Sequence, residues 1–351
     1  MFPDVTAHPP LCSRIVYWAS SRPADLASLC RTCKVFQQSA EAKLYQNLMF
    51  LDPTRAYLAC RAVILQSRYG SYVRVFWFTQ ESRRQPQHLS NTFWTALQDS
   101  LSRMPNLEIL HLSDSTFNNS WILDPSRLKF QLHEAKLRLP WDRHLVNFLQ
   151  SQRKLRVLQI IDQMDDVVRL QIQPSTLPFL QVFDGNLMIA LQFLACPLTH
   201  LQIDVDMEAP QVLKLLPRLA LVQKTLRSLN ILGLPDEVAI RALDFIAKSC
   251  PLLRHIGTFP YPIINRQRFY YILMHIHYLR TIELDIHRWQ PLPSPAGQRA
   301  LAAEIRMYRP TTQQVVFWVG QARIRWILQG EDWIQRIENN QYSHSNLWAV
   351  A

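Results

Sequence analysis

The sequence has 351 residues, and at about 100–200 residues per domain this length predicts two or three structural units. Hydrophobic residues make up 48% of the chain, which predicts a large buried core and excludes a mainly disordered protein. The formal net charge is +11, from 38 Lys and Arg against 27 Asp and Glu. This charge permits an acidic partner, whether nucleic acid, an anionic membrane surface or an acidic protein, without choosing among them.

The six cysteines are sparse, whereas a secreted disulfide scaffold would cluster them. We therefore expect a reducing compartment, the cytoplasm, the nucleus or both. Residues Met1–Asp4 show no basic segment followed by an apolar run, so no signal peptide is expected. The longest charge-free run, Gly185–Ile203, contains several polar residues and part of a leucine motif. It predicts a buried helix, turn and strand rather than a membrane span.

Residues 1–50 are expected to form a small helical module, because they contain few β-branched residues. Its apolar positions are Ile15, Trp18, Leu26, Leu29, Phe36 and Leu44. Two or three short helices cannot bury both faces of such a module, which predicts an exposed apolar patch for a partner. Residues 51–104 are expected to form connecting helices, the first beginning at Asp52 and Pro53, and a weak first repeat at Val73.

A leucine pattern recurs through residues 105–290. It reads Leu-x-x-Leu-x-Leu, with Ile or Phe allowed at the later positions. Seven good copies begin at Leu107, Leu155, Leu180, Leu198, Leu226, Leu253 and Leu279, and a weaker copy begins at Leu132. From Leu107 onward the copies start about 18 to 28 residues apart, near the 20–29 residues expected of leucine-rich repeats.

Each copy predicts a short strand whose alternate leucines point inward. Helical stretches lie between copies, for example Val238–Ile246, whose apolar residues recur at spacings of three and four. Because helices are wider than strands, stacked units should curve into a right-handed β-α superhelix with strands on the concave face. The predicted fold class is therefore α/β. The alternative is an ordinary α/β domain whose strands look alike by chance.

Residues 291–351 are expected to close the last repeat. Pro291–Gly297 predicts a linker, and a helix should end near Tyr308. Strands are predicted at Val315–Trp318, Arg323–Ile327 and Trp333–Ile334, with turns at Gly320 and Gly330. This aromatic-rich end predicts a cap of β-hairpin type over core that the last repeat would otherwise expose.

The helical module resembles an F-box in the segment from Arg14 to Tyr45, around Leu26-x-x-Leu29-x-x-x-Cys33-Lys34-x-Phe36. With the repeats behind it, the chain is similar to fungal-type F-box proteins with leucine-rich repeats. The resemblance implies that the module binds the Skp adaptor of a cullin–RING ubiquitin ligase while the repeats hold the substrate. The adaptor-facing positions that it implies are Pro9, Leu11, Ile15, Leu26, Leu29, Cys33, Lys34 and Phe36.

The match has one departure. Where the family opens with Leu-Pro-x-Glu, the chain has Ala7-His8-Pro9-Pro10, which lacks the leading leucine and the acidic residue.

Familiar catalytic motifs are absent from the sequence. Its seven glycines are scattered, and both dinucleotide fingerprints and phosphate loops need clustered glycines. There is no Gly-x-Ser-x-Gly elbow and no His-Glu-x-x-His motif. We expect no catalytic residue and no cofactor, although an enzyme whose catalytic residues come from distant positions remains open.

Metal binding is not expected either. Cys30 and Cys33 have metal-ligand spacing, but no second cysteine pair or close histidine pair follows to complete a zinc site. They are interpreted as residues of the helical module. His275 and His277 point to different faces of a helix, so with His287 they are interpreted as surface or half-buried residues.

The predicted concave face carries polar but not basic side chains. In the seven good copies, the residues two, four and six positions after the first Leu include four acids and no Lys or Arg. This pattern argues against nucleic acid in the groove, because phosphate contacts need basic residues there. The candidate substrate-binding residues are His111, Gln159, Asp184, Gln202, Asp204, Asn230, Glu283 and Asp285.

Arginine instead follows the first Leu of four copies, at Arg156, Arg227, Arg254 and Arg280. Stacked repeats should align these residues along one rim. They could simply keep the strand ends soluble, or they could form a basic rim that pairs with an acidic partner.

The sequence therefore predicts a non-enzymatic subunit that joins a Skp adaptor and cullin ligase to a target protein. The first alternative is a leucine-rich-repeat scaffold without a ligase role, and the second is a nucleic-acid binder. No membrane partner is expected.

Overall fold

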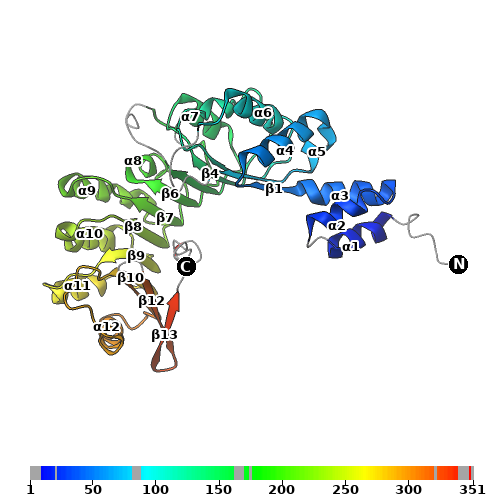
Figure 1. Ribbon diagram of the computed structural model, residues 1–351. Helices are drawn as coiled ribbons and strands as arrows, with labels where there is room; N and C mark the ends of the chain where they lie inside the picture. The colour runs from blue at the N-terminus through cyan, green and yellow to red at the C-terminus, as the bar shows by residue number, and fades with distance from the viewer. Residues whose placement is uncertain are drawn as a thin grey trace. The chain divides into compact units, whose positions relative to one another are not determined.

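The computed structural model describes residues 9–19, 22–80, 88–161, 170–173, 176–319, 322–338 and 348. The chain divides into two compact units, Met1–Leu177 and Pro178–Ala351, so the division falls inside the predicted repeat domain. In each unit, parallel strands form one layer and helices cover one side of it (Figure 1). The predicted α/β fold class is confirmed.

Three helices open the first unit: α1 (Pro9–Ala19), α2 (Pro23–Leu29) and α3 (Lys34–Gln46). Their core is small, because Val16, Leu26 and Ala40 are the buried apolar residues at its centre. The prediction that the whole segment to residue 50 is helical was wrong. Strand β1 (Asn47–Phe50) follows α3 directly, because its backbone pairs in parallel with β2 (Val75–Thr79).

A buried carboxylate attaches the three-helix module to the helices that follow. Glu41 in α3 is 5% exposed and accepts hydrogen bonds from Gln37 in the same helix (2.8 Å) and from Arg68 (2.9 Å). Arg68 belongs to α5 (Ser67–Tyr72), where the Tyr69 hydroxyl also donates to Glu41 at 3.3 Å. All three donors contact Oε1, whereas Oε2 accepts no hydrogen bond from the described residues, so the burial of this carboxylate is compensated at one of its two oxygens.

The rest of the first unit repeats a strand followed by a helix or loop. Strands β1 to β5 pair in parallel and in chain order. The remaining strands are β3 (Ile109–Ser113), β4 (Glu134–Arg138) and β5 (Val157–Ile161), and the remaining helices are α4 (Pro53–Leu65), α6 (Asn91–Leu101), the short η2 (Ser120–Ile122) and α7 (Arg143–Ser151). The weak copies at Val73 and Leu132 thus precede real strands, β2 and β4. Asp52 begins α4 as expected, accepting a hydrogen bond from the Thr54 amide.

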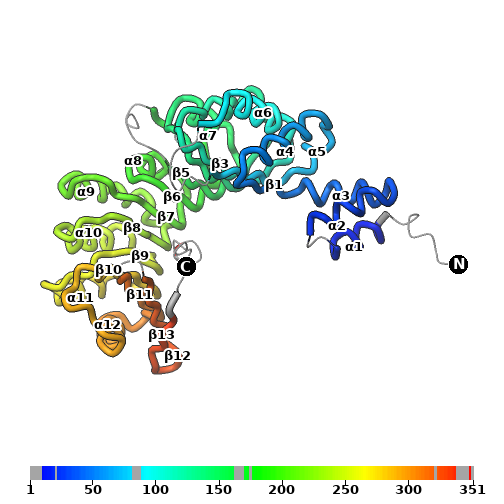
Figure 2. Tube along the Cα trace, in the orientation of Figure 1, coloured from blue at the N-terminus to red at the C-terminus, as the bar shows by residue number. Residues whose placement is uncertain are grey.

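The second unit repeats the same plan, and its strand-and-helix coils, each made of one strand and the helix that follows it, lie in chain order (Figure 2). Its parallel strands are β6 (Val182–Asn186), β7 (His200–Asp204), β8 (Ser228–Leu232), β9 (His255–Pro260), β10 (Thr281–Asp285) and β11 (Gln314–Val319). Its helices are α8 (Leu187–Ala190), α9 (Ala209–Leu215), η3 (Leu216–Val222), α10 (Asp236–Ser249), α11 (Arg266–Leu273) and α12 (Pro295–Tyr308).

The leucine pattern explains the core of this unit. Alternate residues of a strand point to opposite faces, so Leu229 and Ile231 of β8 point toward the helices and are fully buried. Leu243 and Ile246 of α10 lie one turn apart and are also fully buried.

The sheet ends in an antiparallel segment, as the sequence predicts. Strand β12 (Ala322–Gln329) pairs with β11, and β13 (Asp332–Glu338) pairs with β12. Gly330 turns the chain between β12 and β13 with a φ of +64°, which glycine adopts without steric cost. The other predicted turn, at Gly320, lies outside the described residues.

We predict that Leu229→Ala lowers the free energy of unfolding by about 2–5 kcal/mol, because it leaves a cavity among fully buried side chains. The matched control is Leu221→Ala in η3, whose side chain is 67% exposed and whose removal should cost no more than about 0.5 kcal/mol. Urea unfolding followed by circular dichroism measures both. Equal losses would contradict the inward orientation of the motif leucines.

Candidate functional site: a polar ladder on the strand face

Three predicted concave residues meet on neighbouring strands of the second unit. Asp184, Gln202 and Asn230 lie at the middle of β6, β7 and β8 and are paired in register. The Gln202 amide donates to Asp184 Oδ1 at 2.8 Å, and the Asn230 amide donates to Gln202 Oε1 at 2.5 Å. Because parallel strands align equivalent positions, one side chain per repeat produces a continuous row of hydrogen bonds.

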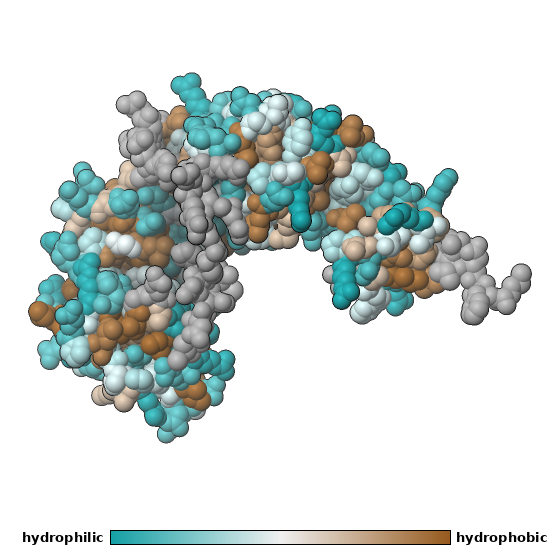
Figure 3. Space-filling view, viewed as in Figure 1, coloured by the Kyte–Doolittle hydropathy of each residue, from teal (hydrophilic) through white to brown (hydrophobic). Residues whose placement is uncertain are grey.

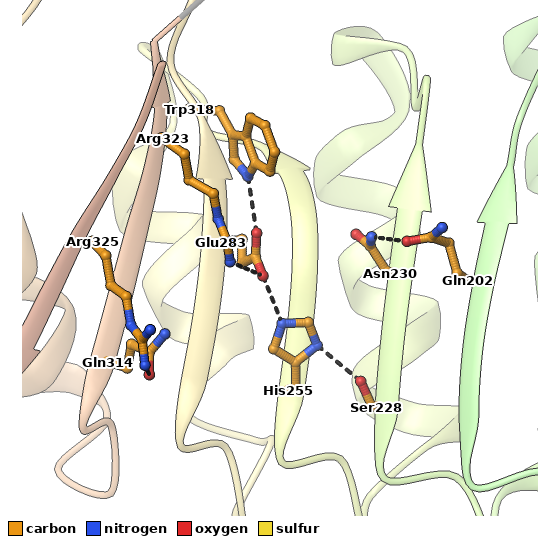
Figure 4. A network of polar contacts seen from close by, with 9 residues as sticks. All are labelled: Gln202, Ser228, Asn230, His255, Glu283, Gln314, Trp318, Arg323 and Arg325. Carbon is orange, nitrogen blue, oxygen red and sulfur yellow. Dashed lines mark hydrogen bonds and ion pairs between the residues drawn. The ribbon is translucent and has the colours of Figure 1, made fainter. Parts of the chain in front are cut away.

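A second chain of contacts crosses the next strands (Figure 4). Ser228 Oγ lies 2.9 Å from His255 Nδ1, and His255 Nε2 lies 3.1 Å from Glu283 Oε1. All three side chains are fully buried. The two rows together form what we call the polar ladder, which extends from Asp184 in β6 to Glu283 in β10.

The antiparallel end of the sheet supplies the last two partners of Glu283. The Trp318 indole of β11 donates to Glu283 Oε2 at 2.9 Å, and the Arg323 guanidinium of β12 donates to Oε1 at 3.1 Å. Burial alone would raise the pKa of Glu283, but the hydrogen bond from His255 and the positive charge of Arg323 outweigh burial. The pKa of this carboxyl group is therefore lowered, and Glu283 is an anion at neutral pH.

A glycine and an irregular strand make room inside the polar ladder. A Cβ atom at Gly257 would lie 2.5 Å from Asn230 Oδ1 and 2.8 Å from His255 Cε1. Strand β9 also has one extra residue, since Ile256 pairs with Ile282 but Phe259 pairs with Leu284. The extra residue, Thr258, has a φ of +51°. Asn230 and His255 thus occupy space that any other residue at position 257 would fill.

The serine, histidine and glutamate resemble a hydrolytic triad only in their order of contact. Ser228 is 0% exposed, so its hydroxyl is closed to a substrate. The Glu283 carboxylate is shared with Arg323 and is not reserved for orienting His255. This arrangement suits a rigid polar network better than covalent catalysis, although Asn230 Oδ1 is buried without a hydrogen-bond partner among the described residues.

The other predicted concave residues lie outside the polar ladder. His111 and Gln159 belong to the first unit, where His111 Nε2 is 2.9 Å from Glu134 Oε1. Asp204 is exposed at the end of β7. Asp285 accepts hydrogen bonds from the backbone and side chain of His287.

Basic residues do lie on the strand face outside the seven good copies, to which the expectation of a face without Lys or Arg applied. Lys136 of β4 is paired with His111 across the sheet, and Arg323 enters the polar ladder from the C-terminal strands. The motif also places Ser228 and His255 on this face, but sequence reasoning did not select either as a binding residue. Nothing in the motif could have indicated Trp318 and Arg323, because β11 and β12 do not carry it.

Three of the four predicted rim arginines form a row. Just before each strand, the Arg254 amide donates to the Arg227 carbonyl (2.7 Å), and the Arg280 amide donates to the Arg254 carbonyl (2.8 Å). Arg254 and Arg280 are exposed, and Arg227 is half-buried. Within the described ranges, none of the three guanidinium groups forms an ion pair. Arg156 belongs to the first unit, so the basic row consists of Arg227, Arg254 and Arg280.

The implied adaptor-facing residues divide between the surface and the interior of the three-helix module. Leu11 and Ile15 of α1 are 44% and 37% exposed, and Lys34 is also exposed. Leu29, Cys33 and Phe36 are partly buried. Leu26 is only 4% exposed, because it fills the module's own core, and it cannot meet a partner. Pro9 lies in the first turn of α1, and its side chain is outside the described residues.

Cys30 and Cys33 flank the turn between α2 and α3 instead of lying within a helix, and all six cysteines are free thiols. In the part of the chain that the structure describes, no three His, Cys, Asp or Glu residues gather as a metal site would require. No described helix has the length and apolar composition needed to cross a membrane.

Comparison with known proteins assigns no family: no family model and no curated protein matches the chain. The function proposed below therefore rests on the fold and on the geometry of these surfaces.

We predict that Glu283→Gln lowers the free energy of unfolding at neutral pH by about 3–5 kcal/mol, because it leaves the buried Arg323 charge without its counterion. The folded pKa of Glu283 lies below its ordinary value of 4.5. Its contribution is therefore complete above about pH 5 and is lost as the pH falls through the folded pKa. Urea unfolding at a series of pH values should show the gap between wild type and variant narrowing only in acid.

The control for this change is Glu108→Gln, which breaks an ion pair with Arg74 whose side chains are each 44% exposed. Such a surface pair contributes no more than about 1 kcal/mol. If Glu283→Gln cost no more than the control, or if its gap stayed constant in acid, Glu283 would not be a stabilising buried anion.

The basic row generates a second prediction. Arg227→Ser/Arg254→Ser/Arg280→Ser should weaken binding to poly-L-glutamate by about threefold to a hundredfold, as expected for three surface pairs of about 0.2–1 kcal/mol each. The matched control replaces three other exposed arginines of the second unit: Arg218→Ser/Arg241→Ser/Arg268→Ser. Fluorescence anisotropy at low and high salt measures both variants. Equal weakening would mean that net charge, and not the row, attracts the polyanion.

Proposed function

We propose that the protein is the substrate-recognition (F-box) subunit of a cullin–RING (SCF-type) ubiquitin ligase, acting in the cytoplasm, the nucleus or both. Helices α1 to α3 bind a Skp-type adaptor. The strand-and-helix coils, a leucine-rich-repeat superhelix in this proposal, bind a target protein. The subunit bridges adaptor and target, and ubiquitin transfer belongs to other subunits.

The observation that carries the proposal is an apolar strip on α1. Leu11, Ile15 and Trp18 are spaced by four and three residues, which places them on one face of the helix. Their side chains are 44%, 37% and 78% exposed. Figure 3 shows apolar surface on the three-helix module. A strip of this kind on so small a module is typical of a protein-binding surface.

The way the module is attached supports its use as a docking element. Its buried contact to the neighbouring helices passes through Glu41 of α3 and the donors Arg68 and Tyr69 of α5. The apolar strip lies on α1, a different helix. An adaptor can therefore cover the strip without breaking the contacts that hold the module to the first unit.

The strand face of the second unit suits target binding through its exposed groups. Gln202, Asn230 and Glu283 are 5%, 4% and 0% exposed, so they hold the face rigid and are not the contacts themselves. The exposed Asp204 at the end of β7 and the basic row before β8 to β10 remain for a partner. A rigid surface loses little entropy on binding.

The first alternative, a repeat scaffold without a ligase role, uses the same strand face but no adaptor. Nucleic-acid binding is less favoured, because the buried Arg323 is already paired with Glu283 and cannot contact phosphate. Binding to the adaptor therefore separates the leading proposal from both alternatives.

We predict that the full chain binds a purified Skp-type adaptor and that Leu11→Asp/Ile15→Asp weakens this binding by at least about a hundredfold, because two buried charges would enter an apolar interface. The readout is isothermal titration calorimetry, with circular dichroism to verify folding. The strip is a better target than Leu29 or Phe36, which pack against the module's own core.

The matched control is Leu58→Asp/Leu65→Asp on α4, where the leucines are 62% and 73% exposed. This control should bind the adaptor as the wild type does. If the wild type bound no adaptor, the ligase role would be refuted. If both double variants lost binding equally, the strip would not be the docking surface.

A further inference from the structure

A cavity of about 420 Å³ opens where strands β9 and β10 end and helix α10 begins, all within the second unit. Its walls come from the first turn of α10, from the loop between β9 and α11, and from the residues after β10. The polar ladder and the basic row do not contribute to this cavity.

One wall of the cavity is apolar and ordered. Ile263 and Ile264 are 57% and 77% exposed, although adjacent isoleucines in a loop would normally be buried. Beside them the Trp289 and Tyr261 rings are stacked, with centroids 5.2 Å apart and planes at 20°. The Trp289 indole also donates to the Tyr261 carbonyl at 2.9 Å, which fixes its orientation.

Three carboxylates also line the cavity, together with His287 and Arg288. Asp236 and Glu237 occupy the first turn of α10, and Asp285 is the last residue of β10. Glu237 forms no ion pair with any described residue. Asp285 uses Oδ1 for both hydrogen bonds from His287, so Oδ2 accepts none from the described residues. Asp236 is 2.7 Å from Arg288, in a pair whose side chains are 48% and 63% exposed.

The apolar wall and the carboxylates together specify the chemistry of a ligand. Because Arg288 is paired with Asp236, an anion would meet the uncompensated carboxylates of Glu237 and Asp285, and a purely aliphatic group would leave these two without a positive partner. A long aliphatic stem that ends in a positive charge satisfies both the wall and the carboxylates. The Trp289 ring already has Arg266 within 6.0 Å of its centroid, so the carboxylates and not the ring would recognise the new charge.

We propose that this pocket binds the side chain of a lysine or arginine presented by the target protein. The stem packs against Ile263, Ile264 and Trp289, and the charged head lies between Glu237 and Asp285. This inference adds a side-chain class to the target binding that we propose for the strand-and-helix coils, and in that sense it rests on the proposed function.

The test titrates the full chain with three small probes, using saturation-transfer difference NMR. N-acetyl-L-arginine methylamide and N-acetyl-L-lysine methylamide should bind with a Kd on the order of 1 mM, as expected for a single side chain. N-acetyl-L-norleucine methylamide, which has the stem without the charge, should bind at least about tenfold more weakly. Equal binding of the norleucine probe, or no binding of the two cations, would overturn the proposal.

Two variants locate the binding. Glu237→Gln/Asp285→Asn should weaken both cationic probes by about tenfold and leave the norleucine probe unchanged. The matched control is Asp206→Asn/Glu208→Gln, which removes the same charge from exposed residues of the same unit. If control and double variant weakened binding equally, the pocket would not be the site. If the double variant is less stable than the wild type, Glu237→Gln alone replaces it in this test, because Glu237 is exposed on its helix.

The outcomes distinguish this inference from the ligase role. Adaptor binding depends on α1 in the first unit, and the pocket lies in the second. Loss of probe binding with intact adaptor binding would overturn the pocket alone. Binding of the cationic probes by a chain that binds no adaptor would overturn the ligase role alone.

Discussion

The strand face of the second unit is organised around the buried carboxylate of Glu283. A fully buried anion is costly unless hydrogen bonds and an opposite charge compensate it. The compensation comes from three other strands: His255 of β9, Trp318 of β11 and Arg323 of β12. Because Arg323 belongs to the antiparallel end of the sheet, the same charge that stiffens the strand face also fixes the closing strands against the last parallel repeat.

Because successive parallel strands repeat in register, residues at the same position of each repeat lie side by side and form a continuous surface. The position before each strand becomes the basic row of Arg227, Arg254 and Arg280 at the amino ends of β8 to β10. The carboxyl ends of the same region carry acids, including Glu237 and Asp285. In this part of the sheet the amino edge is therefore basic and the carboxyl edge carries these acids, with the buried Glu283, already paired with Arg323, between them. A partner with the reverse arrangement of charge would be oriented as well as attracted.

The sequence predicted what depends on short-range periodicity. Alternating leucines such as Leu229, with Ile231 two residues later, identify a strand and its buried face, and equal spacing identifies its neighbours. The rest depends on contacts between unlike segments. Glu283 and Arg323 are far apart in a sequence whose motif ends before β11. The need for glycine at position 257 comes from the side chains of Asn230 and His255, which occupy the space that a Cβ atom there would fill. The pocket combines the first turn of α10 with two loops, and these segments share no motif.

In the three-helix module, too, the sequence pattern identifies the apolar residues, but only packing decides which of them are buried. The pattern treats Leu11 and Leu26 alike, as apolar residues of a helical module, but packing places Leu26 in the core and Leu11 on the surface. Only a few apolar side chains fit within so small a core, so the surplus must lie outside. Helix α3 then continues directly into β1, and Glu41 joins the module to α5. The module that carries the exposed strip is thus joined directly to the first strand of the sheet, without a separate linker. This attachment favours a partner that is held at a defined position relative to the first unit.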